Sequence, residues 1–530
     1  MSASLILMLC GWLFVAIWVP LVILSNRKVH PKALFILFFA EMWERFSYYG
    51  MRALLTLYMT YELFSYMDDT EARTAALGVY GSYTSMAYLF PVVGGIIADK
   101  IFGFRKAVLV GGILMMLGHF ALALEGMVFA GNQNLFFGSL ALIIIGNGYF
   151  KPNISSFVGK FYDIDDPRKD GAFSIFYMGV NIGSLLSILT CGYVGQEISW
   201  HYGFGLAGIG MAIGLLVFWF LGPKAFGDKG LEPDPEGVRK PFLGPLSLNN
   251  IVLVGTILLL PICAALLNLD ALMTSVLLII SAGIILYLII TGIRAKEKIE
   301  GSRLWVIVVL FFFHAVFWAL FEQAGGSLTL FAETNVDRSL FGGEIQAAQL
   351  SFLNPLFVML LAPVFSWLWI KLRKNKREPS TPMKFVLGLV QLAIGFGAIV
   401  IGAKMFANDE GMISMVFLVV MYFFHTSGEL SLSPVGLSMI TKLSPQRIVG
   451  FVMGAWFLSI ALGNKLAGVI GQLTTGEVEE GTEEVALTAI ESLNLYSDTY
   501  LIWGVGVVTS VALVLLLMVP TLRKWMGDIH

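Results

Sequence analysis

Charged residues are scarce in this sequence, and their scarcity excludes most soluble folds. Asp, Glu, Lys and Arg make up 13% of the 530 residues, whereas a soluble domain contains about 25%. Hydrophobic residues make up 57% of the chain, and the mean hydropathy is +0.81. This composition predicts an all-α polytopic membrane protein, because long apolar helices can satisfy their own backbone hydrogen bonds in lipid.

Cysteine and the common signatures of enzymes are also rare or missing. The three cysteines, Cys10, Cys191 and Cys263, lie in apolar runs at unrelated spacings, which favours buried small side chains over a metal or redox site. No His-Glu-x-x-His motif, nucleophile elbow or Cys/His metal spacing occurs, so we expect no metal, no cofactor and no enzyme activity. The net charge is −2 and no long basic tract is present, so we expect no nucleic-acid partner.

Apolar windows long enough to cross a bilayer recur along the whole chain and predict fifteen spans. They fall at about 4–25, 33–60, 74–98, 106–125, 133–157, 172–195, 202–222, 249–268, 271–293, 304–331, 346–370, 384–404, 412–440, 447–473 and 499–520.

The basic residues predict the orientation of these spans. If Met1 lies outside, most of the Lys and Arg residues fall in segments that face the cytoplasm, as the positive-inside rule requires. Only Arg73, Arg338 and Lys404 then face outside, and the outer loop 474–498 is acidic. We therefore expect a multi-pass protein of the plasma (bacterial inner) membrane, with the N-terminus outside and the C-terminus in the cytoplasm.

The order of the spans predicts the domain layout. The first window lacks the basic start and the small-x-small cleavage site of a signal peptide, so we expect a retained helix. Segment 222–248 is rich in Gly, Pro and charge and predicts a cytoplasmic linker. The predicted parts are an extra N-terminal helix, a six-helix bundle, a linker with two inserted helices, and a second six-helix bundle, at 1–30, 31–222, 223–300 and 301–530. Two such halves are typical of transporters.

The second window carries charges that a lipid-facing helix would not tolerate. A charge at the centre of a membrane helix costs about 2.5–3.5 kcal/mol, so several on one helix indicate a pathway or a site. At 100° per residue they fall on one arc that must face a cavity, with Tyr49 at its edge. The residues of this arc are Glu41, Glu44, Arg45, Tyr48 and Arg52.

Two further polar residues lie in the spans that follow. Lys151 ends the fourth core span without an acidic residue within one turn, so we expect it to find a partner on another helix; the alternative is a side chain that snorkels to the cytoplasmic face. Asn181 can donate and accept hydrogen bonds, which suits a peptide or an amine but would equally bridge two helices.

The second half of the chain carries its own buried polar residues. Glu322 is either paired with a base or protonated through desolvation, and a structural ion pair is the alternative to proton coupling. Glu429 is an intramembrane acid and a natural partner for Lys151; the run Gly428–Pro434 around it predicts an interrupted helix. Asn354 and the proline after it predict a second interruption. Lys465 is expected to snorkel outward.

Together these segments resemble the proton-dependent oligopeptide transporter family of the major facilitator superfamily. The first-helix signature of that family, Glu-x-x-Glu-Arg-Phe-x-Tyr-Tyr-Gly, is matched at every fixed position of 41–50. The Phe-Lys-Pro-Asn segment around Lys151, the Phe-Tyr-x-x-x-Asn-x-Gly-Ser segment around Asn181, and the Glu-Gln and Gly-Glu-Leu segments follow in the family's order. The likeness covers about 32–520, and the inserted helical pair resembles prokaryotic members. The helix at 4–25 departs from most members.

The resemblance implies a major facilitator fold and a role for each matching residue. Arg52 and Lys151 would receive the carboxylate of a peptide, and Asn181, Asn354 and Glu429 would receive its amino terminus. Tyr48, Tyr49, Tyr88 and Trp456 would line the pocket. Glu41, Glu44, Arg45 and Glu322 would handle the proton, while Arg52–Glu322 and Lys151–Glu429 would be gating pairs.

The resulting prediction is a proton-coupled symporter that imports di- and tripeptides by alternating access, acting as a monomer in the lipid bilayer. A zwitterionic peptide in a low-dielectric cavity needs a cation at one end and an acid at the other. The alternatives are proton-coupled uptake of another small solute such as nitrate or an amino acid, a peptide sensor that does not transport, and a membrane-embedded enzyme.

Overall fold

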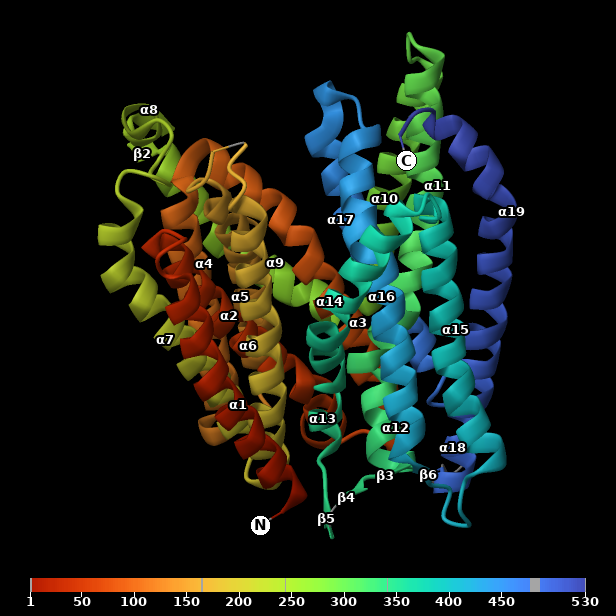
Figure 1. The fold of residues 1–530 in the computed structure, drawn as a ribbon. Coiled ribbons are helices and arrows are strands. Elements are labelled where there is room, and N and C mark those ends of the chain that lie inside the picture. Colours follow the sequence, from red (N-terminus) through yellow and green to blue (C-terminus); the bar gives the residue numbers. More distant parts are fainter. Residues whose placement is uncertain (1, 164, 244, 341, 477–486, 530) are drawn as a thin grey trace. The chain divides into compact units, whose positions relative to one another are not determined.

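The computed structural model describes residues 2–163, 165–243, 245–340, 342–476 and 487–529, and this part of the chain is predominantly helical (Figure 1). It divides into two compact units. Unit 1 contains Met1–Tyr58, Met86–Leu269 and Ser339–Phe352, and unit 2 contains Met59–Ser85, Asp270–Arg338 and Leu353–His530. One long helix, α3 (Asp69–Ile97), contributes residues to both units.

Unit 1 is built mainly from seven long helices and the second part of α3. Its elements are α1 (Ala3–Asn26), α2 (Lys32–Tyr58), η2 (Ala98–Phe102), α4 (Gly103–Val128), α5 (Gln133–Gly159), α6 (Lys169–Glu197), α7 (Trp200–Phe226), α8 (Pro235–Arg239), β1 (Pro241–Leu243), β2 (Leu246–Ser247), α9 (Leu248–Asn268), β4 (Ser339–Leu340), β5 (Gly343–Glu344) and α13 (Ala347–Leu350). The short strands pair antiparallel, β1 with β2 and β4 with β5.

Unit 2 contains the first part of α3 and the remaining elements. These are η1 (Met59–Leu63), α10 (Asp270–Ile293), α11 (Lys298–Phe321), η3 (Glu322–Gly325), α12 (Ser327–Asn335), β3 (Val336–Asp337), α14 (Leu353–Lys374), α15 (Thr381–Met405), β6 (Ile413–Ser414), α16 (Met415–Leu443), η4 (Gln446–Ile448), α17 (Val449–Gln472), α18 (Ala489–Thr499), η5 (Tyr500–Val507) and α19 (Val508–Met526). Strands β3 and β6 pair in parallel.

The predicted membrane spans are confirmed as helices. Within the described residues, 13 helical stretches are long and apolar enough to cross a membrane, and one of them, Asp69–Val128, contains both α3 and α4. The charged helix α2 is not among the 13, because its charges lower its hydropathy. Counting α2, and α3 and α4 separately, gives the fifteen predicted spans. The protein is therefore an all-α, multi-pass membrane protein.

Helix α2 is held tightly inside unit 1, because small residues let its neighbour α6 approach. A Cβ added to Gly183 of α6 would lie 2.1 Å from the carbonyl oxygen of Met42 and 3.0 Å from Cβ of Arg45. Only glycine fits at this crossing. The backbone that carries the charged arc is therefore fixed by direct contact with α6.

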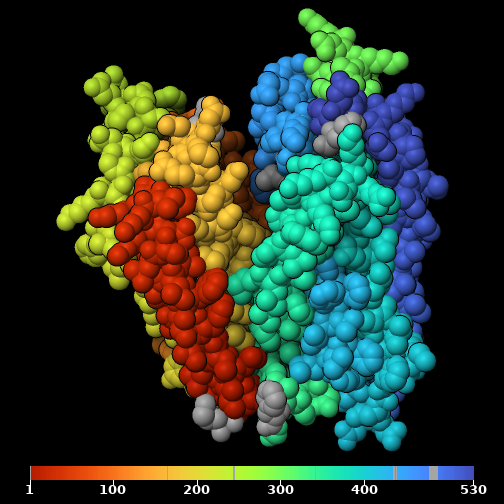
Figure 2. Space-filling model, in the orientation of Figure 1, coloured from red at the N-terminus to blue at the C-terminus, as the bar shows by residue number. Residues whose placement is uncertain are grey.

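The extra helix α1 packs on α6 and shows its other side at the surface (Figure 2). The indole N–H of Trp12 donates to the hydroxyl of Thr190 at 2.9 Å, and the ring lies 6.5 Å from Trp43. On the opposite side Leu13 is 63% exposed and Ile17 is 56% exposed. Such an apolar face is suited to lipid.

The predicted linker forms an ordered cap on α4. The carboxylate of Glu232 contacts Lys106 of α4 at 3.3 Å and Arg239 of α8 at 2.8 Å, and it accepts a hydrogen bond from Asn249 at 3.1 Å. Gly103, where α4 begins, has a φ of 69° and packs directly on the carbonyl of Leu231. These contacts tie the linker to the start of α4.

Two predictions about helix continuity have different outcomes. Helix α16 runs without a break from Met415 to Leu443, so the predicted interruption at Gly428–Pro434 is wrong. A helix tolerates proline when neighbouring helices and side chains satisfy the freed backbone groups. The predicted break near Asn354 is confirmed, because α13 ends at Leu350 and α14 begins at Leu353. Most acidic residues of the outer loop 474–498 lie outside the described residues.

Candidate functional site

The centre of α2 carries a buried cluster of two acids and one base. Arg45 Nε donates to Glu41 Oε1 at 2.8 Å and lies 2.8 Å from Glu44 Oε2. Glu41 is 4% exposed, Arg45 3% and Glu44 0%. Among the described residues, no donor forms a hydrogen bond with either oxygen of Glu44. We call Glu41, Glu44 and Arg45 the α2 triad; it holds one more acid than base in a buried site.

Aromatic residues and a second arginine continue the arc beyond the triad. The Tyr48 and Tyr49 rings meet edge to face with centroids 5.3 Å apart. The Arg52 guanidinium carbon lies 6.0 Å from the centre of the Tyr49 ring. Tyr48 is buried, whereas Tyr49 and Arg52 are only partly buried. The polar arc predicted from residue spacing therefore becomes less buried toward Arg52.

Lys151 of α5 contacts an aromatic ring on another helix, and its predicted pairing with Glu429 stays a prediction. Its Nζ lies 4.1 Å from the centre of the Tyr88 ring, which the second part of α3 contributes to unit 1. A desolvated cation over an aromatic face gains on the order of 2 kcal/mol. Asn181 of α6 is 7% exposed, and its amide donates to the carbonyl of Tyr177 on its own helix.

In unit 2, Asn354 and Glu429 are direct neighbours. The Asn354 amide of α14 donates to Glu429 Oε2 at 3.2 Å and to the Thr426 hydroxyl at 3.1 Å, both on α16. This hydrogen bond brings the carboxylate of Glu429 close to the side-chain amide of Asn354, which also has a carbonyl oxygen. Both are acceptors, the groups that an ammonium ion requires.

Trp456 and Glu322 occupy different environments in unit 2. The Trp456 ring stacks on His314 with centroids 4.0 Å apart, and His314 Nδ1 lies 2.6 Å from the Ser459 hydroxyl. Glu322 is 4% exposed and begins the 3₁₀ turn η3, where α11 gives way to α12. The two predicted gating pairs, Arg52–Glu322 and Lys151–Glu429, each combine a residue of unit 1 with a residue of unit 2. Both pairings therefore stay predictions.

Sequence reasoning placed Lys465 wrongly. The side chain does not snorkel outward: it is 2% exposed, forms an ion pair with Asp270 of α10 and donates to the Ser82 hydroxyl at 3.0 Å. A lone lysine in one span and a lone acid at the start of another were the only signals in the sequence. They lie 195 positions apart, so periodicity could not join them.

A second buried acid, Glu125 near the end of α4, was also missed. It is 0% exposed, accepts a hydrogen bond from the Tyr58 hydroxyl of α2, and accepts one from the backbone N–H of Gly131 at 2.9 Å. The apolar window 106–125 ends at this residue, whereas α4 continues to Val128. A glutamate at the end of an apolar window is the signal that could have identified it.

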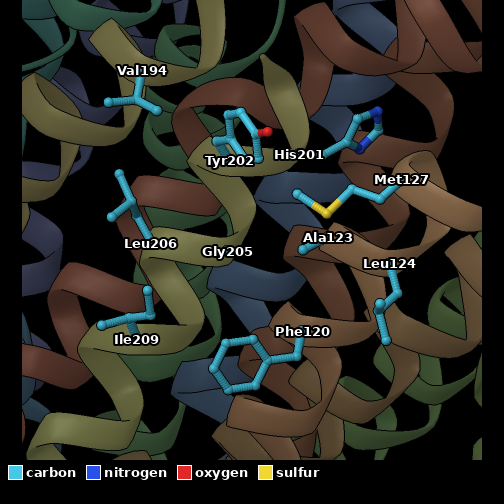
Figure 3. Close-up of a pocket in the computed structure, with 10 residues that line it drawn as sticks. All are labelled: Phe120, Ala123, Leu124, Met127, Val194, His201, Tyr202, Gly205, Leu206 and Ile209. Atoms are coloured by element: carbon cyan, nitrogen blue, oxygen red, sulfur yellow. The ribbon is translucent and has the colours of Figure 1, made fainter. Parts of the chain in front are cut away.

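The described residues also form an apolar groove of about 660 Å³ between α4, α6 and α7 (Figure 3). Phe120, Leu124, Leu206 and Ile209 line it, and none of the predicted site residues does. Within the described ranges, no group of three or more His, Cys, Asp or Glu side chains is placed to hold a metal ion. The polar clusters, rather than this groove, carry the candidate chemistry.

Comparison with known proteins agrees with this arrangement. The POT family pattern matches residues 105–485. The chain is 39% identical over 448 residues to the transporter YclF of Bacillus subtilis, covering 84% of this chain and 88% of that protein. It is 37% identical to the peptide transporter YePEPT and 32% identical to the dipeptide and tripeptide permease B, both of Yersinia enterocolitica. Each alignment covers 94% of this chain and 96% of the relative.

Solved structures give the same result. A crystal structure of the peptide transporter POT in complex with sulfate matches with a TM-score of 0.78 and 35% identity, covering 94% of this chain and 96% of that one. Fold, buried polar clusters and relatives together define a multi-pass membrane transporter. The chain belongs to the POT family.

Proposed function

We propose that this protein is a proton-coupled symporter that imports di- and tripeptides by alternating access. The α2 triad is the main support for this proposal. It contains two buried acids and only one base, so one of the acids can gain and lose a proton. The named relatives, a peptide transporter and a dipeptide and tripeptide permease, support the substrate class.

The two ends of a peptide need two different sites. Arg52 and Lys151 supply cations in unit 1 for the carboxylate. Glu429 and Asn354 supply hydrogen-bonded acceptors in unit 2 for the ammonium group, with Asn181 as a further amide. Tyr48, Tyr49, Tyr88 and Trp456 supply aromatic walls, which accept varied side chains.

The proton step involves a group of residues rather than one atom. Carboxylates that share a guanidinium titrate together, so we assign the proton to Glu41, Glu44, Arg45 and Glu322 as a set. Protonation of an acid removes its attraction for a base, and a shift between two conformations follows. Arg52–Glu322 and Lys151–Glu429 are the pairs proposed to break and form.

The remaining features of the proposal concern the cellular setting. We propose a plasma-membrane protein with the C-terminus in the cytoplasm and the N-terminus outside, organised as two six-helix bundles at 31–222 and 301–530. The helix at 1–30 and the inserted pair within 223–300 are additions to this core. We propose that the monomer transports, with no enzymatic step.

Uptake into proteoliposomes tests this function. The purified protein should accumulate labelled dialanine when an inward proton gradient is imposed, and unlabelled dipeptides should compete. Nitrate or histidine as the better competitor would favour the other-solute alternative. Binding without turnover would favour a sensor. Accumulation that ignores the proton gradient would contradict the proposal.

Variants of the peptide-end residues sharpen the test. Lys151→Met and Glu429→Gln should each raise the KM for dialanine by about tenfold or more, since a charge-assisted contact is worth about 1.5–3 kcal/mol. Lys28→Met, an exposed lysine of the first loop, is the matched control and should leave the KM unchanged. An unchanged KM in both site variants would contradict the assignment of the peptide ends.

A further inference from the structure

Three residues from distant parts of the sequence form a closed polar triangle inside unit 2. Lys465 Nζ of α17 pairs with Asp270 Oδ1 at the start of α10 and donates to Ser82 Oγ of α3 at 3.0 Å. The Ser82 hydroxyl donates to the same Asp270 oxygen at 2.9 Å. We call Ser82, Asp270 and Lys465 the clasp.

The clasp is buried where charge is costly. The side chain of Lys465 is 2% exposed and Ser82 is 0% exposed, whereas Asp270 is 35% exposed. An intramembrane lysine persists only when its charge is paired, and such residues are functional-site candidates by default. The residues proposed to bind peptide and proton do not include any member of the clasp.

Around the clasp, α3 and α17 are in close contact. A Cβ on Gly81 would lie 2.9 Å from Cα of Gly468, so the two helices touch through glycine. The Gln472 amide donates to the carbonyl of Thr74 at 3.1 Å, and the hydroxyls of Thr74 and Thr475 lie 2.6 Å apart. We call this contact, between residues 74–82 and 464–475, the α3–α17 seam. At Gly81 and Gly468 the two backbones pack directly on each other, with no large side chain between them.

The seam matters because α3 belongs to both units. Its residues 69–85 pack in unit 2, while its residues 86–97, including Tyr88, belong to unit 1. Alternating access requires contacts between the first and second halves of the sequence to break once per cycle. The seam is a contact of this kind, since α3 comes from the first half and α17 from the second.

We propose that Lys465 is a positioning residue for transport: with Asp270 and Ser82 it fastens the first part of α3 to α17 and to the inserted helix α10, and this clasp sets how often the seam opens. The inference rests on the proposed function only in treating opening of the seam as part of a transport cycle. It also gives the inserted pair a task, because α10 supplies the counter-ion of Lys465.

The charges give the expected behaviour of variants. Asp270→Asn leaves the buried charge of Lys465 without its partner, which destabilises the closed seam strongly, whereas Lys465→Met leaves the partly exposed Asp270 and should destabilise it less. The double variant removes both charges and leaves neutral groups of similar size, so the penalty should largely disappear. The effects should therefore be far from additive, as expected for residues in direct contact.

Peptide uptake kinetics measure this coupling. Because the closed seam must re-form in every cycle, Asp270→Asn should lower the kcat for dialanine by about tenfold or more, and Lys465→Met should lower it by a smaller factor. Its KM should stay within about twofold, since no peptide-end residue is touched. The double variant should recover to within about threefold of the unmodified protein. Ser82→Ala, which removes one hydroxyl, should lower kcat by about threefold to tenfold and remains informative if a charged variant does not fold.

An exposed ion pair serves as the matched control. Lys404 and Asp498 of unit 2 lie 2.8 Å apart, with side chains 41% and 59% exposed. Lys404→Met and Asp498→Asn should leave both kcat and KM unchanged, because exposed pairs contribute little. A loss of kcat in these variants equal to that in the clasp variants would overturn the proposal.

The distance between two spin labels, one on each side of the seam, shows whether the seam is open or closed without a transport assay. Glu71 of α3 is exposed and Val469 of α17 is 37% exposed, so both can be replaced by cysteine after Cys10→Ala removes the exposed native thiol. Pulsed dipolar spectroscopy should show one main distance in the otherwise unmodified protein. Each single charge variant should add a longer component, and the double variant should lose it.

The outcomes separate the clasp from the proposed function. Unchanged distances in the single variants, or a double variant as impaired as the worse single one, would overturn the clasp. If the protein failed to accumulate peptides, the label distances would still test the clasp. If uptake proceeded normally while clasp variants changed neither kcat nor distance, the clasp alone would fail.

Discussion

The α2 triad leads to the sharpest prediction, in which Glu44→Gln uncouples transport from the proton. With both acids ionised, the triad carries two negative charges and one positive charge, so a single proton neutralises it. After the substitution, Glu41 and Arg45 are already balanced and the driving proton has no vacancy to fill. The glutamine has the size of glutamate, and Arg45 keeps its 2.8 Å hydrogen bond to Glu41, so the fold should be retained.

The expected size of the effect follows from the charge count. A dipeptide zwitterion is neutral, so one proton per peptide carries one charge inward. Moving that charge through 100 mV supplies about 2.3 kcal/mol, which corresponds to about fortyfold accumulation of peptide. For Glu44→Gln the accumulation should fall to about onefold, the value for a carrier that only equilibrates its substrate.

Two measurements on the same proteoliposomes test this reasoning. Valinomycin and a potassium gradient set the voltage, and the final ratio of internal to external dialanine gives the accumulation. Counterflow, in which internal unlabelled peptide exchanges for external label, needs no net proton movement and should survive. Glu62→Gln, at an exposed acid just after α2, is the control and should accumulate normally. Near-normal accumulation by Glu44→Gln would refute the charge count, as would a loss of counterflow in a folded variant.

Three further predictions concern stability, and each follows from a single contact. Each can be measured as a change in unfolding of the detergent-solubilised protein. Gly103→Ala should lower the unfolding free energy by about 1–3 kcal/mol, because alanine is strained at this backbone angle, and its Cβ would also clash with the Leu231 carbonyl. Gly95→Ala is the control: its Cβ would make only ordinary van der Waals contact, so the melting temperature should stay nearly unchanged. Trp12→Phe should remove one hydrogen bond and lower the unfolding free energy by about 1 kcal/mol, and an unchanged melting temperature would show that α1 docks without it. In the loop before α15, hydrogen bonds from Arg373 lower the pKa of Glu378 to about 2. This raises stability above the pKa of free glutamate, near 4.3, and the gain is lost as pH falls toward 2. The unfolding free energy of Glu378→Gln should therefore differ from that of the unmodified protein at pH 7 by less than about 1 kcal/mol, since Arg373 is largely exposed, and the two should converge only as pH falls toward 2.

The sequence was informative wherever one helix contains the whole pattern. The charged arc of α2 follows from helical spacing alone, and the structure brings Glu41, Glu44 and Arg45 together within two turns. Spans were predictable for the same reason, since hydropathy is a local property. Pairings between helices were not predictable. Nothing in the spacing joins Lys465 to Asp270, and snorkelling was the simplest expectation for a lysine near the end of its helix.

Continuity of α16 was also beyond local reasoning. A proline six residues after a glycine normally ends or kinks a helix in water, because the freed carbonyl needs a partner. In a bundle the neighbouring helices can supply that partner or tolerate the local geometry. In this part of α16, the Gln391 amide of α15 donates to the hydroxyl of Ser431 at 3.1 Å, which links the two helices. Side-chain support of this kind depends on the tertiary structure.

The packing of α2 limits where movement during transport can occur. Gly183 places the backbone of α6 against Met42 and against Cβ of Arg45, so α2 and α6 cannot slide past one another without a steric clash. The backbone that carries the α2 triad is thus held in place by α6. Under the proposed proton coupling, the response to protonation is expected outside the α2–α6 crossing. A rigid charge-bearing helix of this kind converts protonation into a change of attraction between groups, which is what a population shift between two conformations requires.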